Sequence, residues 1–153
     1  MSVRRATPDD VPELVRLRAV MFAAMGVDHA GPEWAVECDR VLRAALADGS
    51  MAAYVVDRAG GGLRACGVGM IAQRLPGPKN TSGRYGYVQS MATDVDARRQ
   101  GHARAVFAAL LAWFAERGVT AIDLHATGEG AELYRQFGFS ESRFPELGVR
   151  AYR

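Results

Sequence analysis

The feature that most constrains the fold is a helical pattern that lies between two segments with the character of β-strands. Residues 84–93 (RYGYVQSMAT) and 119–126 (VTAIDLHA) are rich in residue types that favour strands. Between them, large apolar residues recur at helical spacing as Val106, Phe107, Leu110, Trp113 and Phe114, and Gly118 ends the run. A strand–helix–strand crossover of this kind predicts an α/β domain.

The other periodic segments extend this unit in both directions. Thr7 is in position to cap a first helix that begins at Pro8, and a second helix is predicted from about Glu33 to Asp48, stopped by Gly49. Residues 51–58 and 63–75 predict a hairpin, residues 129–137 a short helix, and residues 143–153 closing strands. We therefore expect one domain over residues 1–153, with a mixed, mostly antiparallel sheet flanked by about four helices.

Composition and charge exclude several classes of protein. The 153 residues carry a net charge of only +2, and no dense basic block suggests a nucleic-acid partner. No apolar run reaches membrane-spanning length, and the start MSVRRATPDD lacks the apolar core of a signal peptide, so we expect a cytoplasmic protein. Cys38 and Cys66 show no pairing pattern, which indicates free thiols.

Several common functional motifs are missing or lie in the wrong context. His29, His102 and His125 have no metal-ligand spacing, so no metal site is expected, and His125 is interpreted as a surface or hydrogen-bonded residue. The sequence has no P-loop and no G-x-S-x-G nucleophile elbow. GVGMIA at 67–72 formally fits a dinucleotide fingerprint, but it lies within a hairpin strand, where its glycines relieve crowding or form a bulge.

The segment that links the strand at 84–93 to the following helix is an expected anion site. Residues 98–103 (RRQGHA) stand at the helix start, where unpaired backbone N–H groups favour an anion and Gly101 permits close approach. Arg98, Arg99 and Arg104 can add positive charge. A solvated basic turn, in which Gly101 serves only the backbone conformation, explains this segment equally well.

Two motifs, taken together, resemble those of the GNAT superfamily of acyl-CoA N-acyltransferases, and the order of elements matches over nearly the whole chain. RRQGHA fits the pyrophosphate-loop pattern Q/R-x-x-G-x-G/A through Arg98, Gly101 and Ala103. Residues 124–139 (LHATGEGAELYRQFGF) resemble the family's late strand–helix motif, in which L-Y and G-F recur at this spacing. The resemblance implies a GNAT-like fold whose sheet is splayed at the cofactor site.

The resemblance also implies an activity, the transfer of an acetyl group from acetyl-CoA to a primary amine, without a metal. Tyr134 matches the tyrosine that protonates the leaving sulfur, and a backbone N–H near Met91 would stabilise the oxyanion. Thr127 stands where the family often has a cofactor-binding asparagine. The other implied contacts with coenzyme A come from Met91, Ala92 and Thr93 on the strand and from Arg98, Arg99, Gln100, Gly101, His102 and Ala103 in the turn.

The sequence departs from the family pattern at the expected general base. Many members place a glutamate on the strand before the pyrophosphate loop, where this chain has Tyr87, Gln89 and Ser90. Glu33 or Glu37 could substitute, or both are solvated surface charges. A non-catalytic acyl-CoA-binding sensor with the same fold is therefore the alternative to an enzyme. The acceptor, a small-molecule amine or a peptide N-terminus, stays open, as does a homodimer, which is common in such folds.

Overall fold

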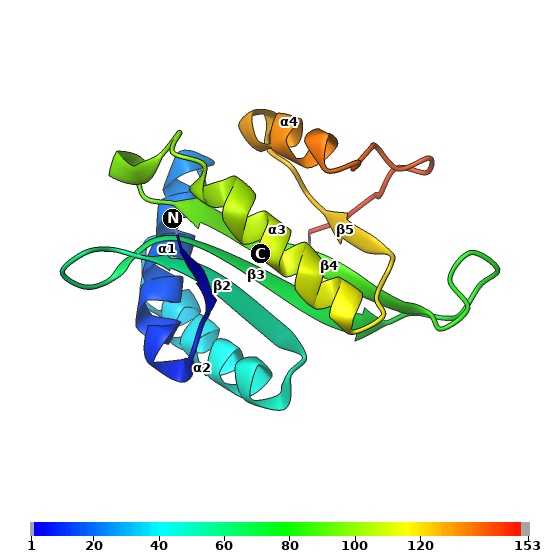
Figure 1. Cartoon of the computed structure of the whole chain (residues 1–153), viewed down its shortest axis with the longest axis horizontal. Coiled ribbons are helices and arrows are strands. Elements are labelled where there is room, and N and C mark those ends of the chain that lie inside the picture. Colours follow the sequence, from blue (N-terminus) through cyan, green and yellow to red (C-terminus); the bar gives the residue numbers. More distant parts are fainter. Residues whose placement is uncertain (1, 151–153) are drawn as a thin grey trace.

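A five-stranded mixed sheet separates the helices of this chain into two layers (Figure 1). The computed structural model describes residues 2–150. The strands lie in the order β1-β2-β3-β4-β5, and only the β4–β5 pair is parallel. Their bounds are β1 Val3–Arg5, β2 Met51–Asp57, β3 Leu63–Gln73, β4 Arg84–Thr93 and β5 Ile122–Leu124. The helices are α1 Val11–Ala24, α2 Glu33–Asp48, α3 His102–Glu116 and α4 Gly128–Gln136.

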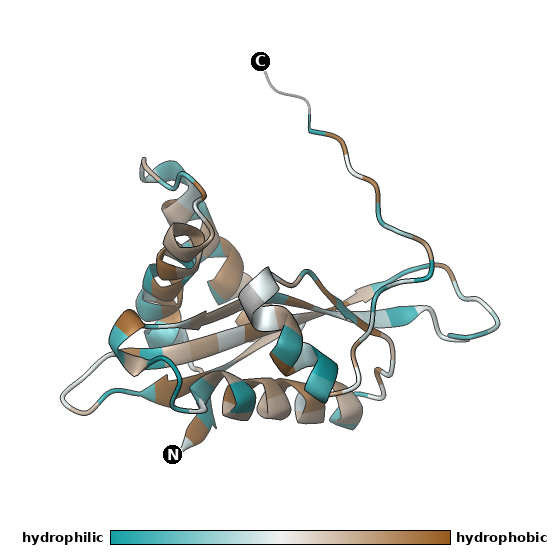
Figure 2. Ribbon diagram, turned by 90° about the horizontal axis from the view of Figure 1, so that it is seen from above, coloured by the Kyte–Doolittle hydropathy of each residue, from teal (hydrophilic) through white to brown (hydrophobic). Residues whose placement is uncertain are grey.

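Helices α1 and α2 cover one face of the sheet and α3 covers the other, as Figure 2 shows. The single-domain α/β architecture, with a mixed and mostly antiparallel sheet and four helices, is confirmed. The predicted bounds of α2 are also confirmed, and Gly49 ends this helix with a left-handed φ of 80°. No helix within residues 2–150 is long and apolar enough to cross a membrane.

The chain differs from the sequence prediction at both of its ends. Val3–Arg5 forms an edge strand, β1, which is too short to show a periodic pattern. The predicted closing strands are absent over residues 143–150, and residues 151–153 lie outside the described part. This tail runs away from the domain (Figure 2), and its Phe144, Leu147 and Val149 are exposed. Pro145 and Gly148 interrupt its apolar pattern, and both residue types weaken strands.

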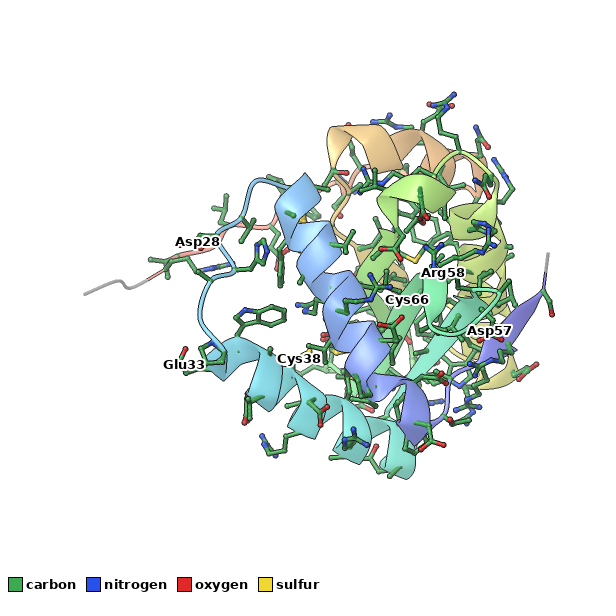
Figure 3. All side chains as sticks on the ribbon, turned by 90° about the vertical axis from the view of Figure 1, so that its left-hand side faces the viewer. Asp28, Glu33, Cys38, Asp57, Arg58 and Cys66 are labelled. Carbon is green, nitrogen blue, oxygen red and sulfur yellow. The ribbon has the colours of Figure 1, made fainter. Side chains whose placement is uncertain are left out.

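Two apolar clusters hold the layers together. The cluster beneath α1 and α2 includes Leu14, Leu17, Leu42, Val55 and Ala92, and the cluster beneath α3 includes Val88, Phe107, Leu110, Trp113 and Phe114. Both cysteines are free thiols on the α1–α2 side of the sheet (Figure 3). Burial raises the pKa of Cys66 to about 12. A thiol with so high a pKa stays protonated and unreactive at neutral pH.

Three strand glycines allow α3 to lie close to the sheet. A Cβ added at Gly67 would approach Val106 Cγ1 to 2.6 Å, and one added at Gly86 would approach the Phe114 ring to 2.5 Å. Gly69 faces the same ring. The interpretation that the glycines of the GVG segment relieve crowding is therefore confirmed, and a dinucleotide loop has no place there. This close packing fixes the position of the α3 N-terminus at the end of β4.

Candidate functional site

Strand β4 contains a β-bulge at Gln89. The register passes from Val68↔Ser90 to Gly69↔Val88, so Gln89 is an extra residue without a partner on β3. Because one extra residue reverses the alternation of side chains, Val88 packs in the α3 cluster, whereas Ala92 packs in the α1–α2 cluster. Ser90 likewise faces α1, where its hydroxyl lies 3.8 Å from Met21 Sδ.

Beyond the bulge, the two parallel strands separate. Strand β5 pairs with β4 only from Gly86↔Ile122 to Val88↔Leu124, and β4 continues to Thr93. Within the part of the chain that the structure describes, no strand covers this far edge of β4, which includes Met91, Ala92 and Thr93. The expected splay of the sheet is therefore confirmed. An extended ligand with amide groups can pair with such an edge as an added strand.

The turn after β4 combines two residues of positive φ with the start of a helix. Arg98 is extended, Arg99 has a φ of 61° and Gly101 a φ of 84°, and α3 begins at His102. Positive φ is costly for a residue other than glycine, and such strain is concentrated at ligand-binding turns. The helix has no side-chain N-cap and no acidic residue in its first turn, so its first N–H groups stay available.

Ion pairs anchor this turn to the rest of the domain. The Asp94 carboxylate accepts hydrogen bonds from Arg16 on α1 at 2.8 Å and from Arg58 after β2 at 3.0 Å, and these guanidinium groups lower its pKa. Arg58, labelled in Figure 3, also pairs with Asp96 at 2.8 Å. Arg104 contributes less to the turn than expected, because its guanidinium binds the Gln136 side chain on α4. Arg98 and Arg99 are exposed and carry the charge there.

His102 can contribute only its backbone to a ligand in the turn. Its side chain is buried, and neither ring nitrogen has a hydrogen-bond partner among residues 2–150. Burial lowers the pKa of His102 below the ordinary value of 6.5, and the positive charge of Arg64 lowers it further. The buried ring therefore stays neutral at neutral pH.

The stability of the protein should therefore depend on pH through His102. His102 binds a proton more readily in the unfolded chain than in the folded protein. Its contribution to the free energy of unfolding is therefore greatest above about pH 6.5 and decreases as the pH falls towards the lowered pKa. His102→Leu should flatten the fall in melting temperature between about pH 7 and pH 5. The exposed His125 provides the control variant His125→Gln. An unchanged pH dependence in His102→Leu would contradict this account.

Tyr134 and Thr127 lie on the other side of the splayed edge, on and before α4. Thr127 is the N-cap of α4, where its hydroxyl accepts a hydrogen bond from the Gly130 N–H at 3.4 Å. The Tyr134 ring packs against Phe107 with the ring centroids 4.9 Å apart, and burial raises the pKa of its hydroxyl above 10. Tyr134 and Met91 pack against the same cluster beneath α3. With its pKa raised, the Tyr134 hydroxyl stays protonated at neutral pH.

A cavity of about 550 Å³ lies on the opposite side of β4, between α1, α2 and the bulge. Its wall is largely apolar and includes Leu14, Phe22, Val27, Trp34, Val41, Leu42, Met51 and Val68. Gln89 and Ser90 of the bulge and Arg18, Asp28, His29, Glu37 and Cys38 supply its polar groups. Figure 3 shows Cys38 between the two helices and Asp28 on the loop that joins them. We call this space the α1–α2 cavity.

Only some of the candidate bases lie at this cavity. Glu37 lines it, whereas Glu33 lies at the outer end of α2 (Figure 3) and is not part of its wall. The Glu37 carboxylate is exposed and binds Arg40, which lowers its pKa. Tyr87 hydrogen-bonds to His125 Nδ1, and His125 Nε2 lies 2.7 Å from Glu146. The interpretation of His125 as a hydrogen-bonded residue is confirmed. Within residues 2–150, no group of three or more potential ligands is arranged to hold a metal ion.

Because Arg40 lowers the pKa of Glu37, this carboxylate is a weak base. We expect Glu37→Gln to reduce turnover with an amine acceptor only slightly at every pH, far less than the roughly 10²-fold loss that follows removal of a positioned base. The measurement is the pH profile of turnover from neutral to alkaline pH, with Glu33→Gln as the matched control. A large loss at neutral pH that recovers at alkaline pH would instead identify Glu37 as the base.

Comparisons with known proteins agree with this geometry. A crystal structure of a predicted acetyltransferase with acetyl-CoA, from Clostridium acetobutylicum, superposes with a TM-score of 0.87 at 24% identity, covering 96% of this chain and 95% of the other. A GCN5-related N-acetyltransferase from Ralstonia eutropha JMP134 gives 0.81 at 28% identity, with 97% of both chains covered. A ribosomal-protein-alanine N-acetyltransferase from Brucella melitensis biovar Abortus 2308 gives 0.70 at 22% identity, with 99% of both covered.

None of the curated proteins matches this sequence. The model of the acetyltransferase (GNAT) family matches residues 17–139, which include β4, the turn at 98–101, α3 and α4. This match extends over most of the 153 residues. The chain therefore belongs to the acetyltransferase (GNAT) family.

Proposed function

We propose that this protein is an N-acetyltransferase that transfers the acetyl group of acetyl-CoA to a primary amine. The proposal rests on one observation: the open edge of β4 is followed directly by the N-terminus of α3, which has no side-chain cap. The structural neighbour from Clostridium acetobutylicum, which is described with acetyl-CoA, supports the same cosubstrate. The α1–α2 cavity meets β4 at its bulge and offers room for the amine.

The residues of this site fit the parts of coenzyme A. The Arg98–Ala103 turn provides backbone N–H groups and two exposed guanidinium groups for the diphosphate. Met91, Ala92 and Thr93 provide the strand edge for the pantetheine amides. Thr127, whose hydroxyl already caps α4, retains a hydroxyl proton that it can donate to the cosubstrate.

Acetyl-CoA supplies an activated thioester, and the chain supplies the groups that stabilise its reaction with an amine. A backbone N–H near Met91 stabilises the negative charge that develops on the thioester carbonyl oxygen. Tyr134 donates its proton to the departing sulfur, for which its raised pKa keeps it protonated. The carboxylates and the histidine at the cavity already have partners: Glu37 binds Arg40, Asp28 accepts a hydrogen bond from the Ala30 N–H, and His29 Nδ1 contacts the Val27 carbonyl oxygen. In this proposal the amine loses its proton to water.

A panel of primary amines tests this proposal against the non-catalytic sensor. The purified protein is mixed with acetyl-CoA and each amine, and thiol release is followed, while calorimetry measures the affinity for acetyl-CoA. We expect binding together with amine-dependent thiol release for at least one class of amine. Binding without turnover on any amine would favour the sensor. Absence of binding would contradict both functions.

A further inference from the structure

Arg18 places a positive charge in the α1–α2 cavity without a negative partner. Within residues 2–150, no carboxylate lies within ion-pairing distance of its guanidinium, whereas Arg16, on the same helix, pairs with both Glu13 and Asp94. Arg18 makes one long hydrogen bond, from Nη1 to the Gln89 carbonyl oxygen at 3.3 Å. Its guanidinium carbon lies 4.9 Å from the centroid of the Phe22 ring.

The surroundings of Arg18 favour a bound anion. A half-buried guanidinium among apolar side chains has lost part of its hydration, and most of its N–H donors have no acceptor among residues 2–150. A carboxylate can accept two parallel hydrogen bonds from such a group, which is the arrangement that guanidinium geometry suits best.

The carboxylates of the cavity wall do not fulfil this role. Glu37 is exposed and paired with Arg40, and Asp28 is exposed on the loop after α1, where its Oδ1 accepts a hydrogen bond from the Ala30 N–H at 3.0 Å. Both belong to the rim of the cavity, whereas Arg18 touches the bulge of β4. The charge next to the reacting strand is therefore positive, which disfavours a polyamine acceptor.

We propose that the acceptor is a free α-amino acid with an apolar side chain, whose carboxylate binds Arg18. This inference rests on the proposed function, because it names the substrate of that site. In an α-amino acid the amine nitrogen and the carboxyl carbon lie only about 2.5 Å apart, as they share one Cα. A carboxylate on Arg18 thus holds the amine beside Gln89 and Ser90, at the start of the open β4 edge.

The apolar wall of the cavity accounts for the side chain of this amino acid. Phe22 and Trp34 meet edge to face, with centroids 5.4 Å apart, and the Trp34 indole N–H is already bonded to the His29 carbonyl oxygen at 2.9 Å. These rings consequently offer apolar surface to a ligand. Phenylalanine or leucine matches this surface, and a cavity of about 550 Å³ accommodates either. A peptide N-terminus lacks the adjacent carboxylate and is expected to bind poorly.

Three acceptors that share one side chain test the role of the carboxylate. Turnover is compared for phenylalanine, phenylalaninamide and phenethylamine, whose amines are respectively intermediate, less basic and more basic. We expect kcat/KM to be roughly 10- to 100-fold higher for phenylalanine than for either analogue, the effect of a charged hydrogen-bonded pair. Because the analogues bracket its basicity, amine pKa cannot produce this order. Equal values for the three, or a preference for a peptide N-terminus, would overturn the inference.

Variants of Arg18 test whether this residue causes the preference for phenylalanine over its analogues. Arg18→Met keeps the apolar stem and should lower kcat/KM for phenylalanine by roughly 10- to 100-fold while leaving phenethylamine nearly unchanged. Arg18→Lys, which keeps the charge without the fork, should retain part of the preference. Arg43→Met on α2, which removes an exposed arginine paired with Asp39 outside the cavity, is the control. An equal loss for phenylalanine and phenethylamine in Arg18→Met would contradict a carboxylate site.

Binding measurements separate this inference from the proposed function. Calorimetry with phenylalanine, in the presence of coenzyme A, is carried out on the parent protein and on Arg18→Met. Phenylalanine that binds the parent and not the variant supports the carboxylate site even if no amine is acetylated, a result that would overturn only the enzyme. Acetylation of phenethylamine without preferential binding of phenylalanine would overturn only the inference. Unchanged melting temperature and acetyl-CoA affinity would establish that Arg18→Met is folded.

Discussion

Replacement of Tyr134 by phenylalanine is expected to lower turnover by roughly 10²–10⁴-fold, the usual effect of removing a positioned acid. The change deletes one hydroxyl and keeps the ring that packs against Phe107 at 4.9 Å, so the fold should be retained. The affinity for acetyl-CoA should change little, because the turn and the β4 edge make the proposed contacts with the phosphates and the pantetheine arm. Turnover and calorimetric affinity, measured for parent and variant, provide the test.

The matched control is Phe137→Leu, which removes an aromatic ring from the same cluster but no hydroxyl. Phe137 packs against Phe107 with the centroids 5.1 Å apart. This variant should lose stability but keep most of its turnover. If Tyr134→Phe behaves in the same way, with a lower melting temperature and normal turnover, Tyr134 is a packing residue and another group protonates the sulfur.

Gly101→Val is expected to abolish the stabilisation of the protein by acetyl-CoA. A ligand at 100 times its Kd stabilises the native state by about 2.7 kcal/mol, and this gain should vanish in the variant. Valine disfavours the φ of 84° at this position, and its side chain would stand where the phosphates are expected to approach the backbone. Thermal unfolding with and without acetyl-CoA measures the effect.

Gly118→Val controls for the backbone cost of this change. Gly118 ends α3 with a comparable φ of 71°, and no atom lies within 4 Å of a Cβ added there. Gly118→Val should lower the melting temperature as Gly101→Val does, yet retain the full increase in melting temperature on addition of acetyl-CoA. Retained acetyl-CoA affinity in Gly101→Val would exclude the 98–103 turn as the phosphate site.

The sequence predicted those parts of the fold that depend on regular patterns or on a local backbone requirement. The apolar spacing of α3 and the end of α2 at Gly49 are visible in the sequence because helices repeat every 3.6 residues and left-handed caps favour glycine. The RRQGHA turn was identifiable for the same reason, since its glycine and its place before a helix are local features. The functional roles of Tyr134 and of this turn stay predictions.

The other features depend on contacts between distant segments. Strand β1 is only three residues long; it pairs with β2, and its Arg4 binds both Asp10 and Asp57. The apolar residues of the tail suggested strands, but over residues 143–150 the tail pairs with none. The α1–α2 cavity, and with it Arg18, requires the packing of two helices against a bulge.

The position of Arg18 on α1 is visible in the sequence, but its unpaired charge is not. It stands at helical spacing on the apolar face of α1, a position where an arginine stem can pack, but the sequence does not reveal that its charge lacks a partner within residues 2–150. A bulge that splays β4 from the next strand was expected from the family resemblance, but its position at Gln89 was not, because a bulge is a relation between two strands. Both features are needed to place an acceptor next to the open edge of β4.

Mass spectrometry of the acceptor provides the most direct test of the proposed function. The purified protein is incubated with acetyl-CoA and, in separate samples, with phenylalanine and with each amine of the panel. The acetylated amine and the released thiol are quantified in each sample. We expect N-acetylphenylalanine and free coenzyme A to form in equal amounts. In Tyr134→Phe the rate at which both form should fall by roughly 10²–10⁴-fold. If acetyl-CoA binds but no amine in the panel gains an acetyl group, the protein is not an N-acetyltransferase for these acceptors and the sensor is favoured.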